Sequence, residues 1–176
     1  PAHAREVAPD SFPDIVQGFL PGPALGVAAR KSGAACYDEA VLVGSARFAG
    51  SGQVDGKFVR IPANAELDLA RDAAYLHITS NNTIEGTQYR QFPKSGTVPL
   101  VADMSSDILS RPFNVSEFAL VYAGAQKNIG PSGVTVVIAS KNWIEAGSKK
   151  IPKIFRFSTH AEQKSLYHTP PTFAVY

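Results

Sequence analysis

Short apolar runs separated by clusters of Gly, Pro, Asn and Ser dominate the pattern along this chain. Runs of this length, rich in β-branched residues and bounded by turn formers, are typical of buried strands. Four of them lie at residues 74–78, 98–102, 118–122 and 134–138. The pattern therefore predicts a sheet with both faces covered, as in α/β proteins.

The first part of the chain has a weaker pattern. Residues 1–33 are rich in Pro, Gly and Ala, and they predict an irregular leading segment with one short helix or strand at 14–20. From residue 34 onward, the periodicity predicts regular elements before the four strands. These are a helix at 36–48, a strand at 57–61 and a short helix at 65–70 that Asn64 caps.

The composition argues against several classes of protein. The net charge of +2 is small and the basic residues are scattered, so no nucleic-acid groove is predicted. No apolar stretch is long enough to span a membrane, and no signal peptide is visible. Cys36 is the single cysteine, which excludes an internal disulfide and fits a reducing compartment such as the cytoplasm. Because the chain begins at Pro1 and ends directly after an apolar run, we expect a fragment of a longer protein.

Polar side chains follow three of the predicted strands at the point where each strand ends. Thr83 lies in the polar loop 79–86 after the first strand, and Asp103 directly follows the second. Gln126 and Lys127 follow the third strand. Ligands of α/β proteins bind at the carboxyl ends of parallel strands, so these side chains can converge on one crevice.

Lys127 is the most reactive of these candidates. Its small neighbours allow a flat ligand to approach the backbone, and a desolvated lysine can form a Schiff base through its neutral amine. Pyridoxal phosphate needs a lysine for its aldehyde and an acid that keeps its ring nitrogen protonated. Asp103 is suited to the second task, since an adjacent anion raises the pKa of the nitrogen. A hydroxyl such as that of Thr83 could bind the ring oxygen.

Each of these residues also has a plain structural interpretation. Lys127 could be a solvated turn lysine, as most lysines are. Asp103 could cap the turn that follows it, and the loop 79–86 could be a turn rich in Asn and Thr. His77, inside the first strand, is interpreted as a packed core histidine rather than a catalyst.

Three stretches resemble the phosphoserine aminotransferase family. They are ADMSSDILSRPFNVSEFALVYAGAQKNIGPSGVTVVI at 102–138, SNNTIEGTQ at 80–88 and YHTPPTFAVY at 167–176. The resemblance, which runs from about residue 74 to the end, implies an α/β fold with a mostly parallel sheet flanked by helices. This is the large domain of the fold type I pyridoxal-phosphate-dependent transferases, with the strand after Lys127 antiparallel at one side. Residues 34–176 would form part of that cofactor-binding domain, without the small C-terminal domain.

The resemblance also implies a role for each site residue. Lys127 would bind the aldehyde of pyridoxal phosphate, Asp103 the ring nitrogen and Thr83 the phenolic oxygen. Gln126 would bind the cofactor phosphate. His168 and Thr169 stand where the family has an Asn-Thr pair that reaches the phosphate of the neighbouring subunit, so a homodimer is implied. No metal site is predicted.

The N-terminal third departs from the family pattern. The family has a Gly-Gly-Ala loop that holds the phosphate and a tryptophan that stacks on the ring. Ala35, Cys36 or Tyr37 would occupy the stacking position, and Trp143 lies after the last predicted strand instead. The arginines that bind substrate in the family lie in segments with no counterpart in this chain.

The activity that the resemblance implies is amino-group transfer between glutamate and 3-phosphooxypyruvate, which gives O-phosphoserine and 2-oxoglutarate in serine biosynthesis. A related phosphorylated hydroxythreonine step of vitamin B6 synthesis is an alternative within the same chemistry. A second alternative is a non-catalytic fragment or degenerate copy that acts only as a structural or binding module. A lysine aldolase without a cofactor ranks last, because it would not need Asp103, Thr83 and Gln126 together.

Overall fold

The computed structural model describes residues 24–28, 37–38, 40–42, 44–169 and 172–175. The strands are β1 (Ala24–Ala28), β2 (Ala46–Ser51), β3 (Gln53–Val54), β4 (Lys57–Phe58), β5 (Tyr75–Thr79), β6 (Asn81–Asn82), β7 (Thr87–Gln88), β8 (Leu100–Asp103), β9 (Leu120–Gly124) and β10 (Thr135–Ala139). The helices are α3 (Lys141–Ala146), α4 (Phe157–Glu162) and α5 (Thr172–Val175), with short 3₁₀ helices η1 (Asn64–Glu66), η2 (Val115–Glu117) and η3 (Lys153–Phe155).

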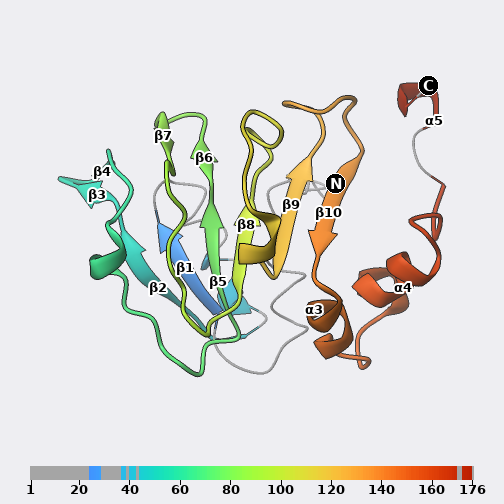
Figure 1. The fold of residues 1–176 in the computed structure, drawn as a ribbon, viewed down its shortest axis with the longest axis horizontal. Helices are drawn as coiled ribbons and strands as arrows, with labels where there is room; N and C mark the ends of the chain where they lie inside the picture. The colour runs from blue at the N-terminus through green and yellow to red at the C-terminus, as the bar shows by residue number, and fades with distance from the viewer. Residues whose placement is uncertain (1–23, 29–36, 39, 43, 170–171, 176) are drawn as a thin grey trace, which may run out of the picture.

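Six strands form one twisted sheet in the order β10-β9-β8-β5-β1-β2 (Figure 1). The pairs β1–β2, β1–β5, β5–β8 and β8–β9 are parallel. Only the pair β9–β10 within this sheet is antiparallel, at the edge. The predicted α/β fold with its antiparallel last strand is therefore confirmed, and the carboxyl ends of β5, β8 and β9 lie side by side.

The central strands are buried on both faces because their side chains alternate between two apolar clusters. Every residue of β5, β8 and β9 is buried. One face contributes the larger cluster, with Leu76, Ile78 and Val121 fully buried. The other face contributes Tyr75, Val101, Leu120 and Tyr122, which pack with Trp143 of α3. The continuous apolar runs in the sequence reflect this burial on both sides.

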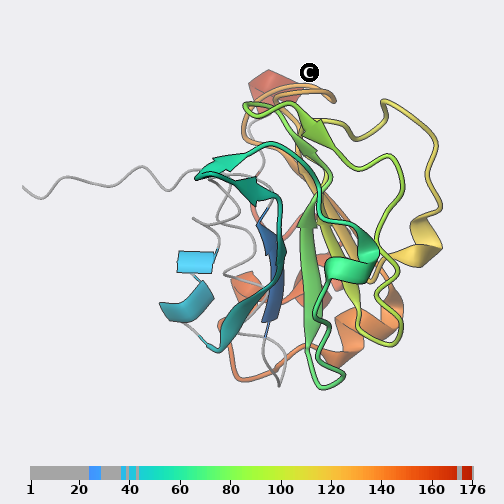
Figure 2. The same cartoon turned by 90° about the vertical axis from the view of Figure 1, so that its left-hand side faces the viewer.

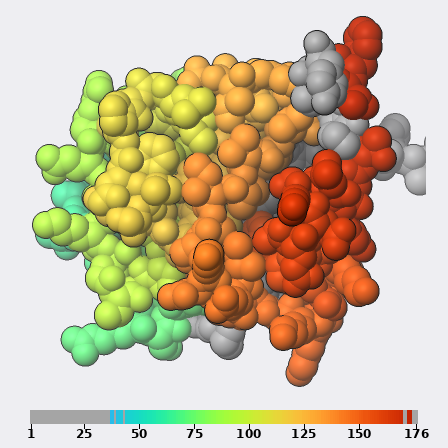
Figure 3. Space-filling view, turned by 45° about the vertical axis from the view of Figure 1, so that its right-hand side comes forward, coloured from blue at the N-terminus to red at the C-terminus, as the bar shows by residue number. Residues whose placement is uncertain are grey.

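The larger cluster is covered by loops and 3₁₀ turns, and the smaller one by the segment after β10. Ile61, Leu67, Phe92 and Phe113 pack on the larger cluster from outside. On the other face, Phe157 of α4 packs beside α3. Figure 3 shows α4 and the chain after it beside the surface of β10 and α3. None of the described helices is long and apolar enough to span a bilayer.

Four predictions for the first half of the chain differ from the structure. Residues 37–38 and 40–42 are helical, but the predicted helix over 36–48 ends early because β2 begins at Ala46 and pairs with β1. Strand β1 lies inside the segment 1–33 that was predicted to be irregular, whereas the predicted element at 14–20 lies outside the described residues. The predicted strand at 57–61 is only β4.

The predicted helix at 65–70 is reduced to the 3₁₀ turn η1, since local ion pairing fixes a different backbone. The carboxylate of Glu66 accepts two hydrogen bonds from the Arg60 guanidinium at 2.7 Å and one from the Ala63 amide at 2.6 Å. These bonds lower the pKa of Glu66 to about 2.

The chain at Gly52 passes very close to Arg60. A Cβ on Gly52 would lie 1.7 Å from the Arg60 carbonyl oxygen, so this close approach requires glycine.

The buried hydroxyl of Tyr89 gives a first testable prediction. Tyr89 is 4% exposed, burial raises its pKa, and its hydroxyl has no hydrogen-bond partner among the described residues. An unpaired buried hydroxyl costs free energy, so Tyr89→Phe should leave the free energy of unfolding unchanged or raise it by about 1 kcal/mol. Urea unfolding measures this.

Tyr122→Phe is the matched control for that measurement. Tyr122 is equally buried, but its hydroxyl lies 3.0 Å from Nε2 of His77. Removing a hydroxyl that is paired in the core should destabilise the protein by about 1–2 kcal/mol. Equal destabilisation by the two substitutions would contradict the assignment of an unpaired Tyr89 hydroxyl.

Candidate functional site

The candidate site lies where the three central parallel strands, β5, β8 and β9, end. This side of the sheet, formed by the carboxyl ends of the strands, is called the carboxyl edge below. In the register of the sheet, Thr79 at the end of β5 pairs with Asp103 at the end of β8, and Asp103 pairs with Tyr122 of β9. The small hairpins β3–β4 and β6–β7 stand at the same end of the sheet (Figures 1 and 2). The topology thus brings the predicted polar strand exits to one edge.

Asp103 is a buried acid at this edge, at the very end of its strand. It is 4% exposed and is the last residue of β8. Its Oδ1 accepts a hydrogen bond from the Ser105 amide at 2.8 Å, so the side chain does cap the turn that follows. The capping bond and a role toward a ligand are compatible, because a carboxylate has two oxygens and several lone pairs.

Lys127 and Thr83 meet at this edge although they are far apart in the sequence. Nζ of Lys127 donates a hydrogen bond to Oγ1 of Thr83 at 3.3 Å. Both side chains are exposed. Lys127 lies in the turn after β9, which is anchored by a bond from the Asn128 side-chain amide to the Ile108 carbonyl. The small residues of this turn would allow a desolvated lysine, but the described residues leave Lys127 exposed.

Gln126 lies at the same edge, in the turn directly after β9. Its side chain is exposed and folds back over Gly124, since a Cβ built on Gly124 would lie 2.8 Å from Oε1 of Gln126. The amide is therefore positioned between the end of β9 and solvent. Thr83, Asp103, Gln126 and Lys127 together place a hydroxyl, a carboxylate, an amide and an amine on one edge of the sheet.

His168 and Thr169 lie apart from this group. Both are exposed and belong to the segment between α4 and α5, which runs beyond β10 in Figure 1. Within a single chain, the structure does not bring them to the other four residues. A contribution to the site of a second subunit, as the resemblance implies, stays a prediction.

The two aromatic candidates near the sheet are core residues. Nε2 of His77 lies 3.0 Å from the Tyr122 hydroxyl, and the histidine is 7% exposed. Trp143 of α3 packs edge-on against Tyr75, the first residue of β5, with ring centroids 6.0 Å apart. Because Tyr75 lies at the opposite edge of the sheet from Asp103, Trp143 does not contribute to the candidate site.

The loop that carries Thr83 is held by a buried polar network that the sequence analysis missed. Asp107 is 7% exposed, and its carboxylate accepts hydrogen bonds from the Ser80 hydroxyl and from Nε2 of Gln88 at 3.2 Å. Nδ2 of Asn82 donates to Oγ1 of Thr87 at 2.6 Å across the β6–β7 hairpin. Asp107 stands only four residues after Asp103, but its partners come from another strand exit, so sequence spacing alone did not reveal them.

Removing the Asp107 carboxylate should loosen this loop. Asp107→Ala removes the carboxylate that accepts from the Gln88 amide and one of the two acceptors of the Ser80 hydroxyl, whose other acceptor is the Asp103 carbonyl oxygen at 3.0 Å. The loss should cost about 1–3 kcal/mol in urea unfolding. Asp72→Ala removes an exposed carboxylate and should change the free energy of unfolding by less than about 0.5 kcal/mol. A loss for Asp107→Ala no larger than that of the control would contradict the structural role.

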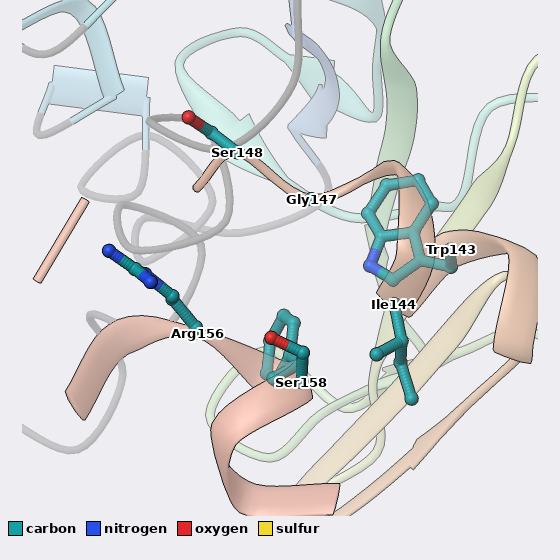
Figure 4. Close-up of a pocket in the computed structure, with 7 residues that line it drawn as sticks. Trp143, Ile144, Gly147, Ser148, Arg156 and Ser158 are labelled. Carbon is teal, nitrogen blue, oxygen red and sulfur yellow. The ribbon is translucent and has the colours of Figure 1, made fainter. Parts of the chain in front are cut away.

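Two hollows elsewhere on the protein do not include the candidate residues. One lies between α3 and the start of α4, is lined by Trp143, Arg156 and Ser158 among others, and has room for about one water molecule (Figure 4). The other, with a volume of about 590 Å³, lies between residues 90–96 and 111–117. Among the described residues, no cluster of His, Cys, Asp and Glu is suited to a metal ion.

Comparison with known sequences identifies relatives of this chain. The family described as Aminotransferase class-V matches residues 52–176. The curated phosphoserine aminotransferase of Herpetosiphon aurantiacus is 52% identical over 139 residues, which are 79% of this chain and 38% of that protein. That of Lysinibacillus sphaericus is 58% identical over 122 residues, which are 69% of this chain and 34% of that protein. The chain thus spans little more than a third of the length of these relatives.

Comparison with solved structures identifies proteins of the same name as the sequence relatives. A phosphoserine aminotransferase from Bacillus circulans subsp. alkalophilus has a TM-score of 0.89 at 42% identity, covering 95% of this chain and 47% of that one. Phosphoserine aminotransferase with bound pyridoxal phosphate from Trichomonas vaginalis has a TM-score of 0.81 at 31% identity, covering 94% of this chain and 47% of that one. The resemblance stated from the sequence motifs, and the fold that it implied, are confirmed.

Proposed function

Because this chain belongs to the class-V aminotransferase family, we propose that it forms the pyridoxal-phosphate-binding edge of a phosphoserine aminotransferase. The observation that carries the proposal is the meeting of an amine, a hydroxyl and a buried carboxylate at the carboxyl ends of three adjacent parallel strands. Nζ of Lys127 lies 3.3 Å from Oγ1 of Thr83. Asp103 is the last residue of β8, which lies in the sheet between β9, the strand before Lys127, and β5. The names of the relatives support the choice of reaction.

The donor set fits pyridoxal phosphate. The cofactor supplies an electron sink that stabilises negative charge on the substrate's α carbon. Lys127 would hold the aldehyde through Nζ, and the Asp103 carboxylate would hold the protonated ring nitrogen. Oγ1 of Thr83 would donate to the phenolic oxygen, while the Gln126 amide would donate to the phosphate. Each contact pairs a group of the cofactor with a side chain of complementary charge or hydrogen-bonding capacity.

Lys127 also carries the proton transfer of the reaction. Its Nζ would take the proton from the α carbon of the amino acid as a general base and later return a proton as a general acid. The hydrogen bond to Thr83 orients Nζ at this edge of the sheet. The Asp103 carboxylate would stabilise the positive charge of the ring nitrogen that faces it.

The proposed substrates follow the names of the relatives. Glutamate donates the amino group and becomes 2-oxoglutarate, while 3-phosphooxypyruvate accepts it and becomes O-phosphoserine. The phosphorylated hydroxythreonine step of vitamin B6 synthesis is the alternative acceptor reaction. We place the protein in the cytoplasm as a homodimer, with His168 and Thr169 reaching the cofactor phosphate of the neighbouring subunit. A non-catalytic copy is less well supported, because the four candidate residues at the strand exits are all present and the identity to the Herpetosiphon protein is 52%.

Amino transfer by the purified chain tests this function. The chain is saturated with pyridoxal phosphate and mixed with glutamate, and 2-oxoglutarate is quantified by mass spectrometry. Addition of 3-phosphooxypyruvate, or of the phosphorylated keto acid of the vitamin B6 step, then identifies the acceptor from the amino acid that forms. Formation of 2-oxoglutarate no faster than with free pyridoxal phosphate would contradict the proposal for this chain.

A further inference from the structure

We propose that Ser105 is a positioning residue that ties the Asp103 carboxylate to the strand that leads into Lys127. This inference rests on the proposed function, because it concerns how the acid and the lysine are held at a fixed distance from each other. Ser105 itself lies on neither of the two strands. It is the second residue of the turn after β8, and it is partly buried.

The hydroxyl of Ser105 bridges two strand ends. It donates a hydrogen bond to Oδ1 of Asp103 at 2.6 Å and accepts one from the Gly124 amide at 3.0 Å. The Ser105 amide donates to the same Oδ1 at 2.8 Å. The end of β8, which carries the acid, is therefore bonded to the last residue of β9, and Lys127 follows that residue by three positions.

The direction of the two bonds is fixed by chemistry. A backbone amide can only donate a hydrogen bond, and a carboxylate can only accept one. The Ser105 hydroxyl must therefore point its hydrogen at Asp103 and its lone pair at Gly124. A bond to a charged acceptor is stronger than one between neutral groups, which restricts the rotation of the carboxylate.

The bridge matters because one rigid ligand is proposed to bind at both ends of it. A ring bound by Asp103 at its nitrogen and by Lys127 at its aldehyde carbon tolerates little error in their separation. Misplacement of a reacting group by about 1 Å can cost about a hundredfold in rate. Linking the two strand ends directly reduces such error more effectively than packing of the turn alone.

The neighbouring serine has a different partner and provides a matched control. The hydroxyl of Ser106 donates to the Asn81 carbonyl at 2.7 Å and accepts from the Asn81 side-chain amide at 2.9 Å. Ser106 is also partly buried. It thus makes the same number of hydroxyl bonds as Ser105, but it links the turn to β6 rather than the acid to β9.

The first test needs no cofactor. Hydrogen exchange of the Gly124 amide, divided by that of Val121 in the same strand, is compared in the wild type, Ser105→Ala, Ser105→Thr and Ser106→Ala. This ratio of exchange rates cancels any change in global stability. Ser105→Ala removes the hydroxyl that accepts from the Gly124 amide, so the ratio should rise about tenfold. Ser105→Thr keeps a hydroxyl and Ser106→Ala leaves Ser105 intact, so both should have the wild-type ratio. An unchanged ratio in Ser105→Ala would overturn the bridge.

The second test uses the same variants saturated with pyridoxal phosphate labelled with ¹⁵N in the ring. Ser105→Ala should weaken cofactor binding about tenfold and move the ring ¹⁵N signal toward that of the neutral ring, and Ser105→Thr should restore both. A Ser105→Ala protein that matches Ser106→Ala in both readouts would overturn the positioning role. If the wild type itself binds no cofactor, the proposed function and the cofactor role of Ser105 fail, while the exchange ratio still decides whether the bridge exists.

Discussion

A Lys127→Ala protein is expected to keep its fold and to lose the visible absorption band of covalently bound pyridoxal phosphate completely. Lys127 is an exposed turn residue whose side chain donates to Thr83, so its truncation should change the free energy of unfolding by less than about 0.5 kcal/mol. The band depends on the amine itself, which alanine lacks. Absorbance and urea unfolding of the same sample measure the two effects.

Two further variants sharpen this experiment. Lys127→Arg keeps the positive charge but has no nucleophilic amine, so it should lose the band as completely as the alanine variant. Lys57→Ala removes an exposed lysine of β4 and should retain the band. A band of normal intensity in either Lys127 variant would contradict the assignment of this residue as the attachment point.

Asp103→Asn is expected to bind the cofactor within about tenfold of the wild type but to lower the rate of amino transfer by about 10²–10³-fold. The asparagine oxygen can still accept the bonds from Ser105, so the turn is preserved while the negative charge is lost. Without that charge the ring nitrogen is less readily protonated, and the electron sink is weaker. Cofactor titration and single-turnover kinetics with glutamate separate binding from rate.

Asp103→Ala serves as the comparison for the structural part of that effect. It also removes the oxygen that accepts the hydrogen bonds from Ser105. The free energy of unfolding should therefore be about 1–3 kcal/mol lower than that of Asp103→Asn. If the asparagine variant transfers amino groups within about threefold of the wild type, the charge of Asp103 has no catalytic role. Loss of rate only in the alanine variant would identify Asp103 as a structural cap.

The central strands could be predicted from the sequence because burial on both faces produces continuous apolar runs. The runs at 74–78, 98–102 and 118–122 match β5, β8 and β9 within two residues at each end. The shared location of the candidate residues followed from this pattern, since polar residues directly after parallel strands must lie at one edge of the sheet. The bond between Lys127 and Thr83 is the consequence of strand order, which brings residues 44 positions apart together.

The first half of the chain was harder to predict for a physical reason. Ala46 and Phe48 fit an apolar helical face as well as a strand, and only pairing with β1 decides for the strand. The supporting polar groups were missed for the same reason. Ser105 and Asp107 look like ordinary turn residues in sequence, because their hydrogen bonds are made to Gly124 at the end of β9 and to Ser80 between β5 and β6.

The most direct test of the account is to identify the lysine that binds pyridoxal phosphate. The purified chain is mixed with the cofactor, reduced with borohydride and digested, and the modified peptide is located by mass spectrometry. The account predicts a single modified residue, Lys127, at close to one label per chain. Label scattered over exposed lysines, or no visible band before reduction, would contradict the claim that these strand ends form a cofactor site.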